Sequence, residues 1–524
     1  MDYDPFSLLF LLSLLSSFFY ISALSQAPKL SGFLIDCGSV SSLVDARGLT
    51  WSSDDRFISS GVPLNVSIPG LEPTLSTLRS FPYRPSSAAR NRKFCYIIPI
   101  YRGGRYLVRT TYFYGGVNGL GAPPVFDQIV DGTFWTKVNT TADYAAGMSS
   151  YYEAVFLAKG KTISVCIAGN AAYTESDPFI SALEVILLDN SVYNATNFNE
   201  NAMGLIARSK FGSPGPIERY PDDRYDRYWQ PFIDNSDAVS STHNVTVTNF
   251  WNHPPADVFS TALVAAQDGA LVLQWPPLSL PNSSYYIALY FGDTLPDSFR
   301  SFNVFINDYI FYNRLSVTSS GLVVFATPWI LSGETRITLT PESVLPPLIN
   351  AGEVFGLFPL GRVTHTRDVI SLEKIKESIN NPPDDWYGDP CMPQGYSWTG
   401  ISCSEGASRV RVVTLNLSSM GVSGSLSPHI ANLTALTAIS FADNNISGTI
   451  PDLSKLNWLE RLHLQDNHLT GTIPQSLGNV KKLRELYLQN NDLGGQVPTN
   501  VLTKPGLDLK LTPGNNFSSS PPAS

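Results

Sequence analysis

The residue types that most often carry catalysis or bind metals are sparse in this sequence. Its 6 histidines show no His-Glu-x-x-His spacing of a zinc site, and no Gly-x-Ser-x-Gly nucleophile turn accompanies them. Two adjacent acid pairs, Asp222 with Asp223 and Asp384 with Asp385, could serve a glycosidase only if two carboxylates faced each other across a cleft. Adjacent acidic residues in proline-rich loops are more often solvated turn residues than catalytic groups. The sequence therefore predicts no catalytic residue, no metal site and no cofactor.

Aromatic and charged residues are interleaved between positions 220 and 229. The rings there form a candidate glycan platform, made of Tyr220, Tyr225, Tyr228 and Trp229. Aromatic rings can cover the apolar face of a sugar while neighbouring acids bind its hydroxyls. The same residues lie where a second β domain would begin, and there they could instead hold two domains together. The sequence favours this structural interpretation and leaves the platform as the alternative.

Composition indicates a protein of several domains built mainly from strands. The chain has 524 residues, of which 12% are aromatic, with 38 Gly and 38 Pro. Aromatics suit pleated surfaces, whereas Gly and Pro interrupt helices. A formal charge of -9 and the lack of a basic stripe provide no field for a phosphate backbone, so nucleic acid is not expected as a partner.

The N-terminus predicts entry into the secretory pathway. Residues 6–24 are uncharged, and small residues at Ala23 and Ser25 fit a cleavage site, so residues 1–25 are interpreted as a signal peptide. Asp2 and Asp4 replace the usual basic start, and retention of this segment as an anchor is the alternative. Sequons for N-glycosylation fit the same pathway, at Asn65, Asn139, Asn194, Asn244, Asn282, Asn416, Asn432, Asn445 and Asn516.

The 5 cysteines leave at least one without an intrachain partner in an oxidising compartment. Cys391 and Cys403 flank an aromatic-rich turn and are predicted to form a disulfide. Cys37, Cys95 and Cys166 either include one further bond or remain buried thiols, and the sequence does not choose between these outcomes.

A repeat of leucines and asparagines fills the last third of the chain. Equivalent positions are held by Leu415, Ile439, Leu462 and Leu486, followed at a fixed offset by Asn444, Asn467 and Asn491. Alternate leucines point into a stack of coils, and each Asn satisfies backbone groups where the chain leaves a strand. We expect four leucine-rich repeats and a fragment over 411–515, a linker with a disulfide-closed cap over 363–410, and a flexible tail over 516–524.

Strand positions between the core leucines project onto the concave face of such a stack. They define a candidate partner surface made of Arg461, His463, Gln465, Glu485, Tyr487 and Gln489. Tyr and Arg contribute strongly to interfaces, although four coils offer a modest area and an ordinary solvated face is the alternative. Asn416 lies on the same face, where a glycan would shield one end.

Residues 26–362 show β patterns throughout, with strand-like runs at 106–114 and 162–167 bounded by Gly or Asn turns. The region is long for one sandwich, and its character changes near residues 190–201. The sequence therefore predicts a mainly β fold with two tandem jelly-roll sandwiches, at 26–200 and 201–362, followed by the short repeat solenoid.

Several motifs carry a family resemblance across this region and the repeats. They include Phe-Leu-Ile-Asp-Cys-Gly-Ser at 33–39, Asp-Arg-Tyr-Trp at 226–229 and Gly-Asp-Pro-Cys at 388–391. Together they resemble plant malectin-like, leucine-rich-repeat receptor proteins, and the last is similar to the junction in symbiosis-receptor-type ectodomains. The resemblance implies recognition of a cell-wall carbohydrate, a peptide or a receptor-kinase co-receptor, without catalysis.

That resemblance also implies a place outside the cell. We expect an apoplastic protein, or one held at the plasma membrane by a partner or a longer isoform, because no second membrane span follows the N-terminal segment in this sequence. Two alternatives stay open at this point. One is a secreted enzyme acting on wall polysaccharide, and the other is a structural or decoy ectodomain.

Overall fold

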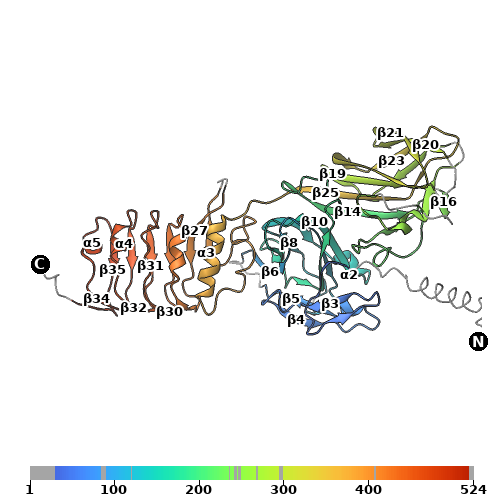
Figure 1. Ribbon diagram of the computed structural model, residues 1–524. Coiled ribbons are helices and arrows are strands. Elements are labelled where there is room, and N and C mark those ends of the chain that lie inside the picture. The colour runs from blue at the N-terminus through green and yellow to red at the C-terminus, as the bar shows by residue number, and fades with distance from the viewer. Residues whose placement is uncertain are drawn as a thin grey trace, which may run out of the picture.

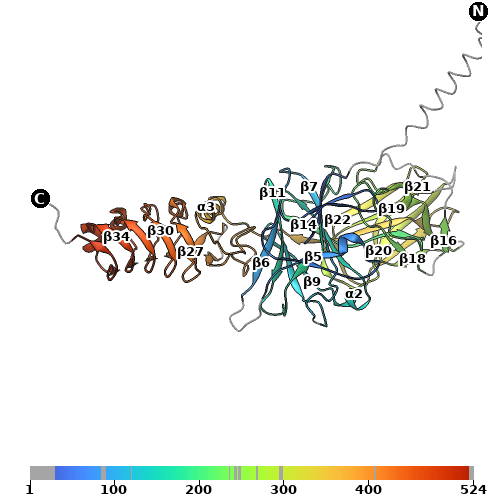
Figure 2. The same cartoon turned by 90° about the horizontal axis from the view of Figure 1, so that it is seen from below.

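The computed structural model describes residues 30–83, 90–119, 121–234, 237–240, 245, 250–266, 269–293, 299–405 and 409–518. The predicted signal peptide, the sequon at Asn244 and residues 519–524 of the predicted tail lie outside the described residues. Two β lobes lie side by side, and a slender stack of coils extends from the first lobe (Figures 1 and 2). The predicted order of two β-sandwiches followed by a repeat solenoid is confirmed.

The first sandwich is built from central strands that are buried over most of their length. Its elements are β1 Gly32–Asp36, β2 Leu43–Val44, β3 Thr50–Ser53, β4 Val62–Asn65, η1 Pro73–Leu75, β5 Thr77–Ser80, β6 Arg92–Pro99, β7 Arg105–Tyr112, β8 Phe126–Val130, β9 Thr133–Val138, α2 Thr141–Ala145, β10 Ser150–Leu157, β11 Thr162–Gly169, β12 Phe179–Ile180 and β13 Ala182–Leu188. A front sheet ordered β2-β3-β1-β13-β7-β10 faces a back sheet ordered β6-β11-β8-β9. Val108 and Val165, one from each sheet, are fully buried in the core between them.

The second sandwich repeats this plan, again with a four-stranded back sheet. Its elements are β14 Asn201–Phe211, β15 Gln230–Phe232, β16 Asp237–Ser240, η2 Ala256–Phe259, β17 Thr261–Val264, β18 Leu271–Gln274, β19 Leu280–Phe291, β20 Arg300–Ile306, β21 Tyr309–Val317, β22 Leu322–Gly333, β23 Arg336–Pro341, β24 Leu348–Ile349 and β25 Ala351–Pro359. The front strands run β14-β25-β19-β22, and the back sheet runs β18-β23-β20-β21. Phe302 and Ile287 are fully buried between them.

The two front sheets form one continuous sheet. β10 of the first sandwich pairs with β14 of the second, with Ala154 opposite Gly204 and Val155 opposite Met203. Because the backbones are joined by sheet hydrogen bonds, the two sandwiches are not separate bodies linked by a tether. The sequence predicted two tandem sandwiches, and the shared sheet is what the structure adds.

The repeat domain begins with a helix that the sequence did not predict. Its elements are α3 Thr366–Glu377, β26 Ile401–Cys403, β27 Val412–Asn416, β28 Ser423–Ser425, η3 Pro428–Asn432, β29 Ala438–Ser440, β30 Asn445–Gly448, β31 Arg461–His463, β32 His468–Gly471, α4 Ser476–Asn479, β33 Glu485–Tyr487, β34 Asp492–Gly495, α5 Thr499–Leu502, β35 Asp508–Lys510 and β36 Asn516–Phe517. Leu372 and Ile375 of α3 are buried in the leucine core, so the first part of the expected linker is a helix that caps the stack.

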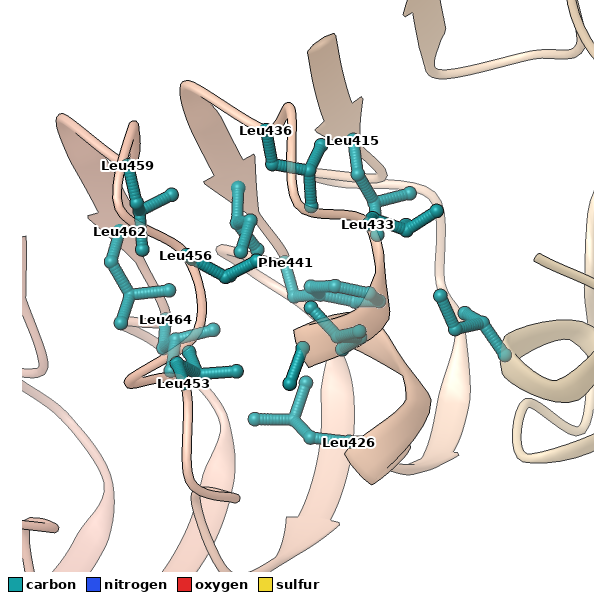
Figure 3. Packing of buried hydrophobic residues seen from close by; sticks show 14 of the residues in the cluster. Leu415, Leu426, Leu433, Leu436, Phe441, Leu453, Leu456, Leu459, Leu462 and Leu464 are labelled. Atoms are coloured by element: carbon teal, nitrogen blue, oxygen red, sulfur yellow. The ribbon is translucent and has the colours of Figure 1, made fainter. Parts of the chain in front are cut away.

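Leucines and asparagines hold the coils together as the repeat predicts. Leu415, Leu462 and Leu464 point inward with their equivalents from neighbouring coils (Figure 3). The Asn467 side chain accepts a hydrogen bond from the Ile446 N–H (2.9 Å) and donates to the carbonyl of Phe441 (2.8 Å), both in the preceding coil. Each Asn therefore satisfies buried backbone groups that would otherwise lack partners.

The last coil corrects the expected start of the tail. Asn516 and Phe517 form β36, which pairs with β34 of the preceding coil. The stack therefore extends beyond residue 515 to at least Phe517, because β36 is the last strand of the sheet β28-β30-β32-β34-β36. Among the eight described sequons, Asn432 is half-buried and the other seven asparagines are exposed.

Two disulfides are present among the described residues. Cys391 is bonded to Cys403 in the cap, and Cys95 is bonded to Cys166 across β6 and β11. Cys37 remains a buried free thiol. The structure thus selects one of the outcomes that the sequence left open for the three upstream cysteines.

Candidate recognition site

The candidate glycan platform is not an open surface, because Trp229 and Tyr225 are buried and Tyr220 and Tyr228 are half-buried. Trp229 has 0% and Tyr225 4% of its surface exposed. The Tyr228 ring lies between the guanidinium groups of Arg109 (3.7 Å) and Arg219 (4.0 Å). Tyr220 is half-buried, so these residues present no flat open surface to a sugar. They support the structural interpretation that the sequence favoured.

These aromatics cover a buried network of ion pairs that crosses the junction. Arg109 of the first sandwich binds Glu153 (2.9 Å) and Glu184 (2.6 Å). Arg208 of the second sandwich binds Glu153 (2.7 Å) and Glu353 (2.6 Å). Glu153 therefore bridges the two halves, and removing either arginine would leave a carboxylate buried without its partner.

The electrostatics of the network differ from one acid to the next. Burial raises the pKa of Glu184 above its usual value of 4.5, opposed by Arg109 and reinforced by Asp226. The pKa of Glu153 is lowered, because Arg208 and Arg109 together outweigh the burial that opposes them. Such shifts can mark active sites, but here every group contacts a protein partner, which indicates a structural role.

A hollow of about 630 Å³ lies at the junction of the two sandwiches. We call it the trough. Six aromatic residues and three prolines are among its lining residues, which include Trp135, Tyr151, Tyr152, Gly204, Ile206, Gln230, Pro231, Phe232, Pro277, Leu278, Pro281, Ser283, Tyr285, Gly356 and Phe358. Its volume lies within the range of ordinary ligand sites.

Glycines make the floor of the trough. Gly204 on β14 lies opposite Gly356 on β25, and Gly356 lies opposite Tyr285 on β19. A Cβ at Gly204 would lie 3.4 Å from the Phe358 ring, and one at Gly356 would lie 3.8 Å from the Tyr285 ring. Side chains alternate along a strand, so Gly204 faces the side of the sheet opposite to the Met203 side chain.

Trp135 at the edge of this floor has an indole N–H without an acceptor among the described residues. Its ring is 9% exposed, and its Nε1 lies 3.7 Å from where a Cβ of Gly204 would be. Other buried indoles do have acceptors: Trp51, Trp229, Trp275, Trp386 and Trp398 all donate to protein oxygens. The Trp135 nitrogen is not among the buried polar atoms that lack a partner, so its N–H is accessible and can donate to a ligand acceptor.

The predicted partner surface is brought together as expected from the repeat. β31 and β33 pair in parallel, with Arg461 opposite Glu485 and His463 opposite Tyr487. The His463 and Tyr487 rings stack at 4.4 Å, and His463 lies 2.8 Å from Glu485. Arg461, His463 and Gln465 also line a hollow of about 410 Å³ that includes Asn416.

The Gly-Asp-Pro-Cys segment joins the repeats to the first sandwich. The left-handed backbone of Gly388 (φ +69) lets it approach the Cys95 sulfur, which would lie 2.9 Å from an added Cβ. The Asp389 carboxylate accepts hydrogen bonds from the N–H groups of Thr364 (2.8 Å) and Cys391 (2.9 Å). Lys93 donates to the Asp389 carbonyl (2.6 Å), and burial lowers its pKa to about 8. The motif therefore holds a specific contact between domains.

The acid pairs considered for catalysis have structural partners. Asp223 binds Arg227 (2.8 Å) and the Trp229 indole (2.9 Å), and Asp385 accepts from Thr399 Oγ1 (2.6 Å). Within the described ranges, no group of three or more His, Cys, Asp or Glu residues could hold a metal ion. No helix among those residues is long and apolar enough to cross a membrane.

The sequence did not predict the trough, because its floor pairs residues that are far apart along the chain. One signal was present: Gly204 and Gly356 interrupt strand patterns, and such glycines often mark a close approach. Their pairing in register could not be known without the sheet order.

Comparison with known proteins places these features in a family. The Malectin-like domain model matches residues 35–357, and the Leucine Rich Repeat model matches 458–480 and 482–502. A leucine-rich repeat receptor-like serine/threonine-protein kinase of Arabidopsis thaliana is 31% identical over 440 residues, 80% of this chain and 49% of the relative. The probable LRR receptor-like serine/threonine-protein kinase MEE39 of the same plant is 28% identical, over 80% of this chain and 48% of the relative.

The chain spans about half the length of these curated relatives. Solved structures share the fold of its first two lobes. The ANX2 ectodomain of Arabidopsis thaliana is 16% identical with a TM-score of 0.53, over 63% of this chain and 97% of that one. A chain from the structure of the plant peptide RALF23 with FER and LLG2 is 18% identical with a TM-score of 0.51, over 64% and 96%. The chain therefore belongs to the malectin-like family, with leucine-rich repeats following the malectin-like region.

Proposed function

We propose that this chain is an extracellular recognition module that binds its ligand in the trough and performs no catalysis. The observation that carries the proposal is the Trp135 indole N–H, which is accessible from the trough, has no acceptor among the described residues, and lies over the floor made by Gly204 and Gly356. A hollow lined by aromatics with a few directed polar groups is typical of a ligand site.

The relatives support recognition as the class of function. The curated relatives are named as receptor-like kinases, and this chain aligns with about half of each. One structural neighbour comes from a complex of a plant peptide with FER and LLG2. A peptide or a co-receptor is therefore a supported class of partner, and a cell-wall glycan remains the other class that aromatic walls could accept.

The repeats would add a second contact rather than a second ligand pocket. The partner surface, Arg461, His463, Gln465, Glu485, Tyr487 and Gln489, combines a stacked aromatic pair with charges of both signs. Such a surface fits docking of another protein, for example a receptor kinase co-receptor. A glycan on Asn416 would limit that docking to the later coils.

Secretion of the tagged full chain from plant cells tests the proposal. The protein is expected in the medium with N-glycans, and immobilised wall glycans, peptide fractions and receptor ectodomains are then tested for capture. Gly204→Leu should fill part of the trough and reduce ligand capture at least about tenfold. A Cβ at this position would lie 3.4 Å or more from its neighbours, so the fold can accept the new side chain. Gly160→Leu, at a β turn outside the trough lining, is the matched control.

Capture that is equally strong for wild type and Gly204→Leu would place the ligand elsewhere and contradict the proposal. Circular dichroism and thermal unfolding of both variants would show that the folds are intact. Failure of the protein to reach the medium would contradict the extracellular assignment.

A further inference from the structure

We propose that the trough takes an extended, uncharged, proline-rich peptide segment. This inference rests on the proposed function, because it assumes that the trough is the ligand site. It goes further by naming the chemical class of the ligand. Three properties of the trough support it: the composition of its walls, the kind of polar groups left free, and its lack of charge.

The walls are made of flat rings and prolines around a narrow floor. Trp135 and Tyr151 come from the first sandwich, and Phe232 and Tyr285 come from the second. Pro231, Pro277 and Pro281 also line the hollow. Aromatic-lined grooves recognise polyproline II segments, whose rings fit between aromatic side chains and whose backbone is already extended before binding.

Two hydrogen-bond donors of the trough have no acceptor among the described residues. The Trp135 N–H has no acceptor among the described residues. Tyr285 donates its hydroxyl proton to the Pro281 carbonyl (2.7 Å), and so is not available to a ligand. The Tyr151 hydroxyl accepts from Gln230 (3.1 Å), which leaves its own proton free to donate.

A proline-rich backbone matches this inventory. Proline has a carbonyl acceptor and no N–H donor, and polyproline II makes no internal hydrogen bonds. A sugar chain carries hydroxyls that both donate and accept, and the lining of the trough offers these hydroxyls no free carboxylate. The one carboxylate residue in the lining, Glu153, has its oxygens bound to Arg109 and Arg208 in the ion network.

Charge and backbone geometry narrow the ligand further. The charged lining residues, Glu153 and Arg208, bind each other and are fully buried, so the open surface of the trough is neutral. A neutral segment is complementary to it, whereas a charged ligand would find no counter-charge. The floor strands β14, β25 and β19 are paired with one another, so the peptide cannot join as an added strand.

Titration of the secreted full chain with four neutral probes tests the inference. The probes are acetylated, amidated (Pro-Pro-Ala)4, a (Gly-Ser-Ala)4 peptide of the same length, cellohexaose and buffer alone. The proline peptide is expected to bind at or below about 1 mM, with the glycine peptide at least about tenfold weaker. Gly204→Leu should abolish this binding, and Trp135→Phe, which keeps an aromatic ring and removes the donor, should weaken it about 3–10-fold.

Nitrogen-15 NMR spectra of the tryptophan indole N–H groups show directly whether the Trp135 N–H contacts the peptide. The indole signal missing in Trp135→Phe should shift on addition of the proline peptide as its N–H gains an acceptor. The Gly160→Leu variant should bind like wild type, because that position lies outside the trough lining.

Each outcome decides a different question. Equal binding of the glycine peptide, or no proline-peptide binding at about 1 mM, would overturn the ligand class. Binding of cellohexaose that Gly204→Leu abolishes would overturn the inference while leaving the trough as the ligand site. Ligand binding that no trough variant affects would overturn the proposed function itself.

Discussion

The tandem sandwiches and the repeat stack are held together by different means. The sandwiches meet through the β10–β14 strand pairing and a few buried ion pairs between residues distant in the chain, such as Arg208 with Glu153. The repeats are held by many similar contacts between neighbouring coils, such as Asn467 with Phe441. Loss of one contact should therefore cost more at the sandwich junction than in the stack.

Arg208→Met is expected to give the largest loss of stability. The change leaves Glu153 and Glu353 buried without one of their counter-charges, which should cost about 3–5 kcal/mol in the free energy of unfolding. Urea unfolding of the full chain measures this loss of stability. Arg336→Met, which breaks an exposed pair with Asp308, is the control and should cost about 0–1 kcal/mol. Equal losses for both variants would contradict the structural role of the network.

Asn467→Ala should have a smaller effect, confined to the repeats. It removes the acceptor of the Ile446 N–H and the donor to the Phe441 carbonyl, so about 1–3 kcal/mol is expected. Asn479→Ala at an exposed position should change stability by less than about 0.5 kcal/mol. Limited proteolysis can show which domain becomes more susceptible to cleavage. Increased cleavage at the sandwich junction instead of in the repeats would contradict a local role for Asn467.

Asp131→Asn should stabilise the first sandwich by about 1 kcal/mol at neutral pH. Burial raises the pKa of Asp131 from 3.8 to about 6, so its charged form is disfavoured in the fold. Its Oδ1 accepts from the Ser164 N–H (2.7 Å), and an Asn oxygen can do the same.

The pH dependence of this effect has a defined sign. The folded state binds the proton more tightly than the unfolded state, so this group makes stability fall as pH rises from about 4 to about 6. Below pH 4 the advantage of Asp131→Asn should disappear. Thermal unfolding across pH 4 to 8 checks it, and an advantage that is constant with pH would refute the electrostatic cause. The effect of Asn467→Ala in the repeats should not depend on pH, because the asparagine side chain does not ionise, and it serves as the comparison.

Tyr487→Ala should leave unfolding and trough binding unchanged while weakening capture of a partner protein. Its ring stacks on His463 and lies at the centre of the partner surface. Surface plasmon resonance against any receptor ectodomain recovered with the secreted chain measures the effect. Loss of ligand binding in the trough would show that the two surfaces act as one.

The sequence predicted the repeats residue by residue because their contacts are periodic and local. Leu462, Asn467 and Tyr487 lie where the pattern placed them. Helix α3 was missed although the sequence carries its signals: Leu372 and Ile375 share one helical face, Asp368 lies in the first turn and Lys374 in the last. The order of the two sandwiches was predicted as well.

The candidate site could not be predicted in the same way. The residues around Trp229 were correctly suspected of joining two domains, yet their burial depends on Arg109 and Glu353, which lie far away in the sequence. The trough depends on the register of Gly204 with Gly356 and on a Trp135 ring from another sheet. Such sites are set by sheet order, which composition and spacing do not encode.

Side-chain footprinting of the full chain tests most directly whether the sandwiches, and not the repeats, select the ligand. Hydroxyl radicals label exposed side chains, so the protein is labelled with and without the ligand recovered from the secretion experiment. Ile206 and Leu278 in the trough should be protected, while His463 and Tyr487 should be labelled as before. Protection confined to His463 and Tyr487 would contradict the assignment of ligand choice to the trough.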